Sequence, residues 1–261
     1  GIHVEGARAD MNEIFAYKRQ ISAKLSSGIE SLFKGAKIDL IRGRAQITAP
    51  GRVHVELNEG GCDELAAERI IAATGSVPAR PPITGLDLPG VMTSDELLEG
   101  ADTPYQSIVI IGGGVIGVEF AAFFSQLGCR VTLVEGMANL LPQLDRELGQ
   151  NLAQILKKQG VEVLASAMVR SVEQTAGGLC VRLEQKGKEL AVVGERVLCA
   201  IGRRAYFDGL FAADLAPALN GKRLLVDENY QTSIPGVYAI GDVSAAVQLA
   251  HVCLLYTSDA A

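Results

Sequence analysis

The sequence lacks the cysteine patterns that mark redox or metal chemistry. Its 261 residues include five cysteines, and none forms a CxxC or CxxxxC pair or a His/Cys cluster with zinc spacing. We therefore expect no metal site. Scattered single thiols indicate a reducing, cytoplasmic setting. We expect Cys129 and Cys199 in the core and no catalytic role for them or for Cys62, Cys180 and Cys253.

Positive charge is also scarce. The chain has 24 Lys and Arg against 30 Asp and Glu, a net charge of −6. Without a basic stripe, nucleic acid and acidic membrane surfaces are disfavoured as partners. The stretch SIVIIGGGVIGVEFAAFF at 107–124 is nearly long enough to cross a bilayer, but glycines and Glu119 interrupt it. This pattern favours a strand followed by a helix over a membrane span.

Neither end has the features of a protein terminus. The chain begins GIHVEGARAD, with no initiator Met and no signal peptide. Its last nine residues, CLLYTSDAA at 253–261, resemble a translated adapter sequence from library preparation. We expect these nine residues to be non-native and the chain to be a piece of a longer protein.

Apolar spacing predicts an α/β protein. A helix is expected over 10–34, because its apolar residues repeat on one face. These residues are Ile14, Tyr17, Ile21, Leu25, Ile29, Leu32 and Phe33. Alternating runs predict strands at 38–48, 52–57 and 68–74. The proline-rich stretch at 75–90 predicts an irregular connector.

From Ser107 the pattern becomes strand, helix, strand, helix, strand, which predicts a parallel α/β unit. The expected segments are 107–112, 115–127, 130–135, 145–158 and 161–166. Strand-like runs at 168–174, 179–185 and 196–202 predict an antiparallel layer that leads back to the main sheet, and 223–243 has β character. No repeat has the spacing of a solenoid.

A glycine fingerprint stands between the first of these strands and its helix. Gly112, Gly114 and Gly117 form GxGxxG. The first glycine permits a tight turn, the second lets the backbone approach a pyrophosphate, and the third allows close helix–strand packing. The phosphates are expected at the helix start, at Val115 and Ile116. The alternative is a glycine-rich turn without a ligand.

An acidic residue follows at the expected distance. Glu135 ends the strand VTLVE, 135 − 117 = 18 residues after the last glycine, where a carboxylate binds the ribose 2′-hydroxyl. A carboxylate would repel the 2′-phosphate of NADP, and no arginine follows closely. The sequence therefore favours NAD.

Several separated motifs resemble one family. The run GGGVIGVEFAAFFSQLGCRVTLVEGMANLLPQLDRELGQNLAQILKKQGVEV occurs with IIAATGS, CAIGRR and TSIPGVYAIGD. Together they resemble the pyridine nucleotide-disulfide oxidoreductases, and among these most closely the bacterial dihydrolipoyl dehydrogenases. The similarity runs from about residue 1 to 252.

The resemblance implies an NAD-binding Rossmann-like domain inserted into a partial FAD-binding domain. Residues 1–102 then correspond to the latter part of the first FAD segment and a linker. Residues 103–218 correspond to the NAD domain and 219–252 to the returning FAD segment, and 253–261 are the non-native tail.

The resemblance also implies cofactor contacts. Those expected near FAD are the Ala45 backbone beside the adenine, the turn of Thr74, Gly75 and Ser76, the second FAD motif of Gly241 and Asp242, and a helix start at Gln248, Leu249, Ala250 and His251. A helix N-terminus there would stabilise negative charge on reduced flavin. Those expected along NAD are Val169, Ala200, Ile201, Gly202 and Arg203. The run RRAYF at 203–207 departs from the family's usual Arg-Pro-Asn-Thr.

Glu119 is the candidate catalytic residue. One interpretation is an acidic residue in the first turn of a helix, favoured by the helix dipole. The resemblance implies instead that it pairs with a lysine, outside this chain, beside flavin N5. We favour the second, because an acid on an otherwise apolar face needs a partner.

The implied enzyme is an FAD-dependent, NAD-linked disulfide oxidoreductase that oxidises protein-bound dihydrolipoamide with NAD⁺. The family's CxxxxC disulfide and His–Glu base have no counterpart here, so we expect this chain to be inactive. The longer protein is expected to be a homodimer in a 2-oxo acid dehydrogenase or glycine-cleavage complex. The alternatives are a single-cysteine NADH oxidase or CoA-disulfide reductase relative, and a non-catalytic NAD-binding module. A mercuric or glutathione reductase is more distant, because glutathione reductases prefer NADP.

Overall fold

Two units divide the chain, and one interrupts the sequence of the other. The computed structural model describes residues 6, 9–100 and 105–248. Unit 1 consists of Gly1–Leu25 and Pro78–Gly202, and unit 2 of Ser26–Val77 and Arg203–Ala261. Most of unit 1 is therefore inserted between the two main segments of unit 2. The domain limits expected at 102/103 and 218/219 stay predictions.

Unit 1 is built on a five-stranded parallel sheet. Its strand order is β6-β13-β7-β8-β9, and every neighbouring pair is parallel. The strands are β6 (Val91–Thr93), β7 (Ser107–Ile111), β8 (Arg130–Val134), β9 (Glu162–Leu164) and β13 (Arg196–Cys199). β7 lies in the middle and is buried along its whole length, as expected for a parallel strand covered on both faces.

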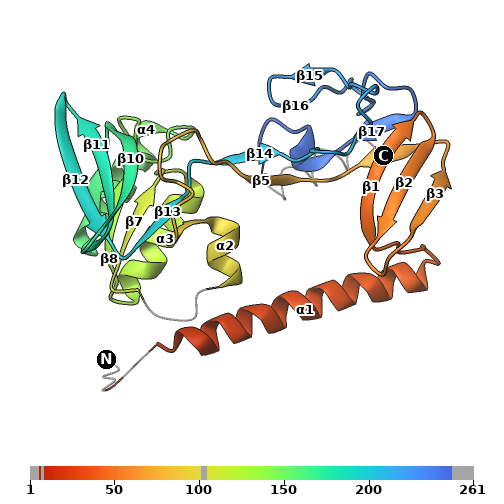
Figure 1. Ribbon diagram of the computed structural model, residues 1–261. Helices are drawn as coiled ribbons and strands as arrows, with labels where there is room; N and C mark the ends of the chain where they lie inside the picture. Colours follow the sequence, from red (N-terminus) through yellow and green to blue (C-terminus); the bar gives the residue numbers. More distant parts are fainter. Residues whose placement is uncertain (1–5, 7–8, 101–104, 249–261) are drawn as a thin grey trace. The chain divides into compact units, whose positions relative to one another are not determined.

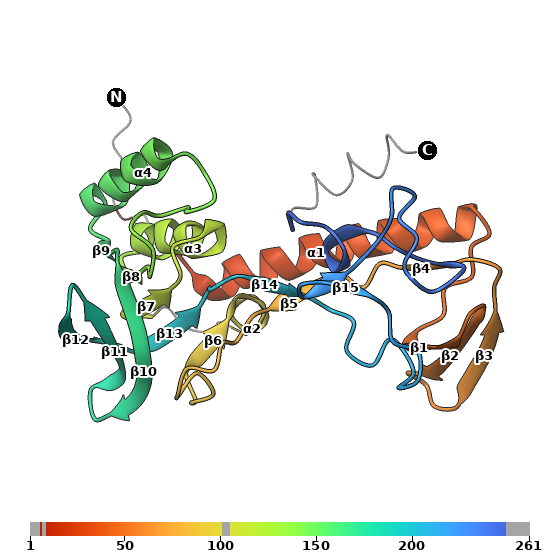
Figure 2. The same ribbon diagram turned by 90° about the horizontal axis from the view of Figure 1, so that it is seen from above.

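The two faces of this sheet are covered differently. Helices α3 (Val115–Gln126) and α4 (Arg146–Lys158) lie on one face, and β10–β12 lie on the other (Figures 1 and 2). The pleat alternates the side chains between them. Ile108 and Ile110 pack in the core that includes Phe124 of α3, whereas Val109 and Ile111 pack with Val181 of the antiparallel layer.

The antiparallel layer consists of β10 (Ala167–Thr175), β11 (Gly178–Gln185) and β12 (Lys188–Gly194), paired in that order. Buried β11 residues face the parallel sheet. Its exposed face carries cross-strand ion pairs, in which Arg170 meets Glu184 at 2.7 Å and Arg182 meets Glu173 at 2.9 Å. Charges on one face and apolar residues on the other are typical of an antiparallel sheet that is covered on one side only.

Unit 2 contains one antiparallel sheet and several two-stranded pairs. An antiparallel sheet contains β1 (Gly43–Ala49), β2 (Arg52–Leu57) and β3 (Cys62–Ala66). β4 (Ile70–Ala72) pairs in parallel with β17 (Val237–Ala239), and β15 (Leu219–Asn220) pairs with β16 (Arg223–Leu224). β5 (Ser76–Pro78) pairs with β14 (Arg203–Ala205). The stretch at 75–90 is thus not wholly irregular, because its first residues find a strand partner far along the chain.

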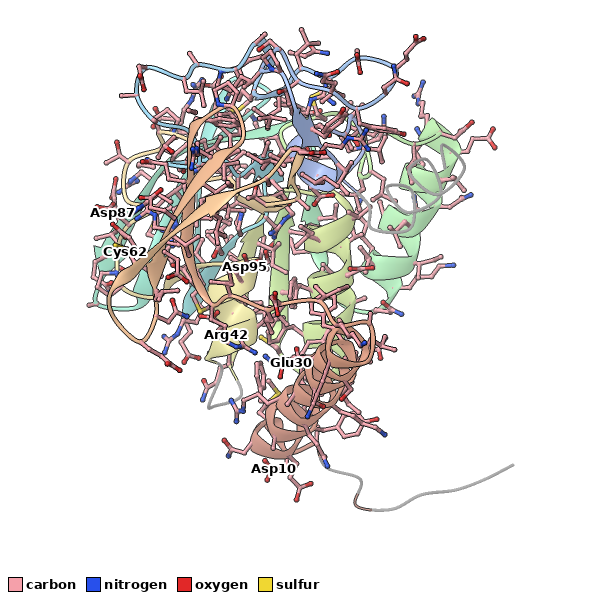
Figure 3. All side chains as sticks on the ribbon, turned by 90° about the vertical axis from the view of Figure 1, so that its right-hand side faces the viewer. Asp10, Glu30, Arg42, Cys62, Asp87 and Asp95 are labelled. Atoms are coloured by element: carbon pink, nitrogen blue, oxygen red, sulfur yellow. The ribbon has the colours of Figure 1, made fainter. Side chains whose placement is uncertain are left out.

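Helix α1 (Met11–Gly35) agrees with the helix expected over 10–34. Only Met11 and Phe15 are buried, at the start of the helix, in the core of unit 1. Most of the remaining apolar stripe is exposed, and its exposed members are Tyr17, Ile21, Leu25, Ile29 and Leu32. Near the helix end, Glu30 forms an ion pair with Arg42, and their side chains lie close together in Figure 3.

No helix within the described ranges is both long and apolar enough to cross a membrane.

A capping box starts helix α2 (Ser94–Glu99), which directly follows β6. The Glu96 carboxylate accepts a hydrogen bond from the backbone N–H of Thr93 at 2.7 Å. Its two oxygens also accept from Nη2 of Arg80, at 2.8 and 2.6 Å. Burial alone would raise the pKa of Glu96, but the Thr93 hydrogen bonds and Arg80 together lower it. The ionised carboxylate therefore stabilises the fold.

We expect Glu96→Gln to lower the free energy of unfolding at pH 7 by about 1 kcal/mol. Because the folded pKa is lowered, this stability is present above the ordinary value near 4.5 and is lost as the pH falls through the folded pKa. The gap between wild type and variant should shrink at acid pH. Urea unfolding followed by circular dichroism measures it, with Glu99→Gln as the charge-matched control. A gap that persists unchanged at pH 3 would contradict this account.

Candidate nucleotide-binding site

Two glycines of the fingerprint are required by backbone contacts inside unit 1. Gly112 has φ of 111°, and a Cβ there would lie 2.4 Å from the carbonyl oxygen of Ala200. A Cβ on Gly117 would lie 1.8 Å from the carbonyl oxygen of Gly112. Any side chain at either position would push the β7–α3 turn away from its neighbours.

Gly114 differs from the other two. It is the N-cap of α3 with φ of −74°, a conformation open to any residue. A Cβ there would meet no atom within 4 Å. No side chain caps α3, and its first turn has no acidic residue. The positive end of a 12-residue helix therefore faces open space, which is the arrangement that suits an anion.

Glu135 lies directly after β8 and against this turn. Its side chain is 8% exposed. One carboxylate oxygen accepts the N–H of Gly113 at 2.6 Å, and the other accepts the N–H of Met137 at 2.6 Å. Each carboxylate oxygen has a second lone pair and can accept a further hydrogen bond. The spacing of the motif brings Glu135 to the loop as expected, but it gives no sign that the carboxylate also ties the loop in place.

Residues after β13 reach the same edge of the sheet. The Ala200 N–H donates to the carbonyl oxygen of Ile111 at 2.7 Å, which joins the ends of β13 and β7. Ile201 is exposed, and Gly202 has φ of 118°. The start of β10 is held here too, because the Ala167 N–H donates to the Glu135 carbonyl oxygen at 2.9 Å. Val169, two residues further along β10, is buried.

Two exposed methionines border this edge and were not anticipated from the sequence. Met137 is two residues after Glu135, and the Met168 side chain lies against Gly136, with its Cε 3.4 Å from where a Cβ would stand. Val115 is exposed in the first turn of α3, and Ile116 is partly buried there. No motif marks the methionines, because Met168 reaches Gly136 only through the contact between the start of β10 and the end of β8.

Glu119 lies in the second turn of α3, since the helix begins at Val115. The first-turn interpretation is therefore wrong, because the helix-dipole effect falls off beyond the first turn. Glu119 is exposed and lines a largely apolar pocket of about 300 Å³, together with Lys18 and Phe120. Lys18 donates to the carbonyl oxygen of Leu98. In the described part of the chain Glu119 has no ion pair.

A second group of expected cofactor residues meets within unit 2. Ser76 donates its hydroxyl to Asp242 at 2.7 Å, and Arg203 donates to the Ser76 hydroxyl at 2.8 Å and to its carbonyl oxygen at 2.7 Å. Thr74 donates to the carbonyl oxygen of Tyr206. Gly75 and Gly241 have φ of 72° and 71°, so both turns use the left-handed region.

The other residues expected near FAD are less connected. Ala45 is exposed on β1, opposite Val55. Gln248 makes a long contact of 3.4 Å from its amide nitrogen to the carbonyl oxygen of Asp242. Leu249, Ala250 and His251 lie outside the described residues, as does Cys253.

The four described cysteines are free. Burial, with the nearby charge of Glu195, raises the pKa of the Cys129 thiol to about 11, and burial also raises the pKa of Cys199. Cys62 is exposed at the start of β3 and is labelled in Figure 3. No group of three or more His, Cys, Asp or Glu that could hold a metal ion occurs among the residues described.

Residues 3–255 match the sequence profile described as pyridine nucleotide-disulphide oxidoreductase. The chain belongs to this family. The family assignment and the α/β fold expected from the motifs are thereby confirmed, and one unit is inserted into the sequence of the other, as the family's fold implies.

Curated family members similar to this chain include two dihydrolipoyl dehydrogenases. The protein of Bacillus subtilis is 33% identical over 262 residues, covering 97% of this chain and 55% of the relative. That of Acholeplasma laidlawii is 36% identical over 247 residues, covering 93% and 70%. The chain spans about half the length of most of the curated relatives that it matches.

A solved family structure is similar along nearly the whole chain. The HOCl-induced flavoprotein disulfide reductase RclA of Escherichia coli superimposes with a TM-score of 0.84 at 29% identity. The match covers 96% of this chain and 56% of that one.

We expect the described thiols to differ sharply in reactivity. Iodoacetamide at pH 8 should modify Cys62 rapidly and Cys129 and Cys199 slowly, because burial holds the two latter thiols protonated. Peptide mass spectrometry over time measures each rate, and unfolding in guanidinium should equalise them. Equal rates for Cys129 and Cys62 in the folded chain would contradict the expectation.

Proposed function

We propose that unit 1 binds NAD(H) at the β7–α3 turn. The observation that carries the proposal is the open space at Gly114, in front of an uncapped helix start, beside the Glu135 carboxylate. The N-terminal N–H groups of α3, at Val115 and Ile116, would hold the pyrophosphate. Residues Ala200 to Gly202 and the start of β10 at Val169 would line the path of the nucleotide.

Glu135 would select the nucleotide. Its carboxylate oxygens each accept one backbone N–H and can accept a ribose 2′-hydroxyl as well. A 2′-phosphate would meet a negative charge that two hydrogen bonds hold in place. The proposed preference is therefore for NAD(H) over NADP(H).

We propose further that the longer protein is an FAD-dependent disulfide oxidoreductase, most like dihydrolipoyl dehydrogenase, that oxidises protein-bound dihydrolipoamide with NAD⁺. The names of the relatives support this. Bound FAD would carry electrons between the nicotinamide and a disulfide. In this chain, Asp242 would accept hydrogen bonds from ribityl hydroxyls of FAD, near its phosphates. Ser76 would hold the carboxylate, and Arg203 would hold Ser76.

The residues of unit 2 fit such a cofactor. Gly75 and Gly241 form left-handed turns next to Ser76 and Asp242, which are hydrogen-bonded to each other. A Cβ on either glycine would have no atom within 4 Å, so there is open space beside both turns. Glu119 is proposed as the residue that pairs with a lysine beside the flavin. Its exposure leaves the carboxylate accessible to such a partner.

We propose three further properties of the longer protein from its similarity to dihydrolipoyl dehydrogenases of about twice this length. These are a homodimer, a cytoplasmic location and membership of a 2-oxo acid dehydrogenase or glycine-cleavage complex. The disulfide and the His–Glu base of the family would have to come from outside the described residues. The four cysteines within the described residues are all free.

Gly114→Ala tests the nucleotide site directly. The added methyl meets no protein atom, so stability should change by less than about 1 kcal/mol. It would occupy the approach to the pyrophosphate, so the Kd for NADH should rise at least about tenfold. Fluorescence titration measures the Kd and circular dichroism the unfolding.

Two other glycines serve as controls for this variant. Gly177→Ala, whose Cβ would make an ordinary contact of 3.9 Å with Val193, should change neither property. Gly117→Ala should lose both stability and binding, because of its backbone overlap. Wild-type NADH affinity in a folded Gly114→Ala protein would refute the proposed site.

Glu135→Gln tests the coenzyme preference. The amide oxygen can replace only one of the two carboxylate acceptors, so NADH affinity should fall about tenfold. NADPH affinity should fall less, because the repelling charge is gone, and the NADH/NADPH ratio should shrink. Glu162→Gln, which removes the same charge from β9 where Glu162 bonds Thr132, is the control. An unchanged ratio would exclude Glu135 as the selecting residue.

A further inference from the structure

A second cavity of unit 1 lies at the edge where the parallel strands begin. It has a volume of about 630 Å³, and its lining includes Ser107, Arg130 and Arg196. These are the first residues of β7, β8 and β13. The glycine turn and Glu135 follow the other ends of β7 and β8. The two sites are therefore separated by the length of the strands.

Arg130 supplies an available positive charge to this cavity. Its backbone N–H donates to the carbonyl oxygen of Gln106 at 3.0 Å, which anchors the residue beside β7. Its side chain is exposed, and among the described residues its guanidinium forms no ion pair. An unpaired guanidinium at the rim of a polar cavity is well suited to bind a carboxylate or a phosphate through two parallel hydrogen bonds.

Arg196 supplies a second, positioned guanidinium. It lies over the ring of Tyr105 at 5.3 Å and donates to the carbonyl oxygen of Glu195 at 3.0 Å. The Glu195 carboxylate is 3.8 Å from Arg196 and also accepts the N–H of Gln106 at 2.9 Å. Two guanidinium groups against one carboxylate leave the cavity with one positive charge in excess.

A buried hydroxyl adds a neutral donor. Ser107 is buried, and its oxygen accepts the N–H of Glu195 at 3.1 Å. Its hydroxyl hydrogen has no acceptor among the residues that the structure describes. Ser107, Arg130 and Arg196 thus bring donors from three neighbouring strands to one cavity.

We propose that this cavity binds a small oxyanion, the phosphate or carboxylate group of a small molecule, at a site independent of the nucleotide site. Arg130 is the principal ligand, Arg196 and Ser107 complete the donor set, and Glu195 opposes the negative charge of the ligand. The proposal does not depend on NAD binding.

Calorimetric titration of the 261-residue chain with inorganic phosphate and with malonate tests the site, at ionic strength held constant with sodium chloride. Wild type should bind at least one of the two saturably. Arg130→Gln should weaken binding about tenfold, whereas Glu195→Gln should tighten it about threefold. The glutamine keeps an oxygen that can accept the Gln106 N–H.

Lys188→Gln, at an exposed position of β12, removes the same charge elsewhere in unit 1 and should leave binding unchanged. Binding of phosphate alone would indicate a phosphate ester as the ligand, and binding of malonate alone a carboxylate. Three results would overturn the proposal: no saturable binding of either anion, equal weakening by Lys188→Gln and Arg130→Gln, or displacement of the anion by saturating NADH.

Discussion

The close approach of backbone to backbone at the ends of β7 and β13 is the contact on which the nucleotide edge depends. Gly112 stands so near the Ala200 carbonyl oxygen that a Cβ would overlap it, and Gly117 stands as near the Gly112 carbonyl oxygen. These two contacts hold the turn, the helix start and the neighbouring strand end as one assembly. The Glu135 carboxylate then joins the end of β8 to it through the Gly113 N–H.

This arrangement gives Glu135 two roles that use different lone pairs of one carboxylate. It closes the glycine turn through backbone hydrogen bonds, and in the proposed complex it also accepts a ribose hydroxyl. Preorganisation of this kind lowers the conformational cost of binding, because the loop is already held before the ligand arrives. In unit 2, Ser76 has a comparable supporting role, since it links Arg203 to Asp242.

Much of this organisation could be predicted from local patterns. The helices at α3 and α4 and the strands at β7 and β8 were expected within one or two residues, because apolar periodicity reports directly on burial. The pairing of β6 with β13 could not be anticipated, because both are short apolar runs whose partners are set by packing. The exposure of Glu119 could not be anticipated, because it depends on which segments pack against its side of α3.

The spacing of the glycines and of Glu135, and the alternation of strand and helix, are short-range properties, so the amino-acid order alone established an α/β nucleotide-binding architecture and the family resemblance. Contacts across long stretches of chain were decided by the fold. Ser76 meets Asp242 across 166 positions, and Gln106 meets Glu195 across 89. No local pattern encodes such pairs, because they form only when the strands have found their order in the sheet. The polar cavity at the strand starts is a consequence of that order.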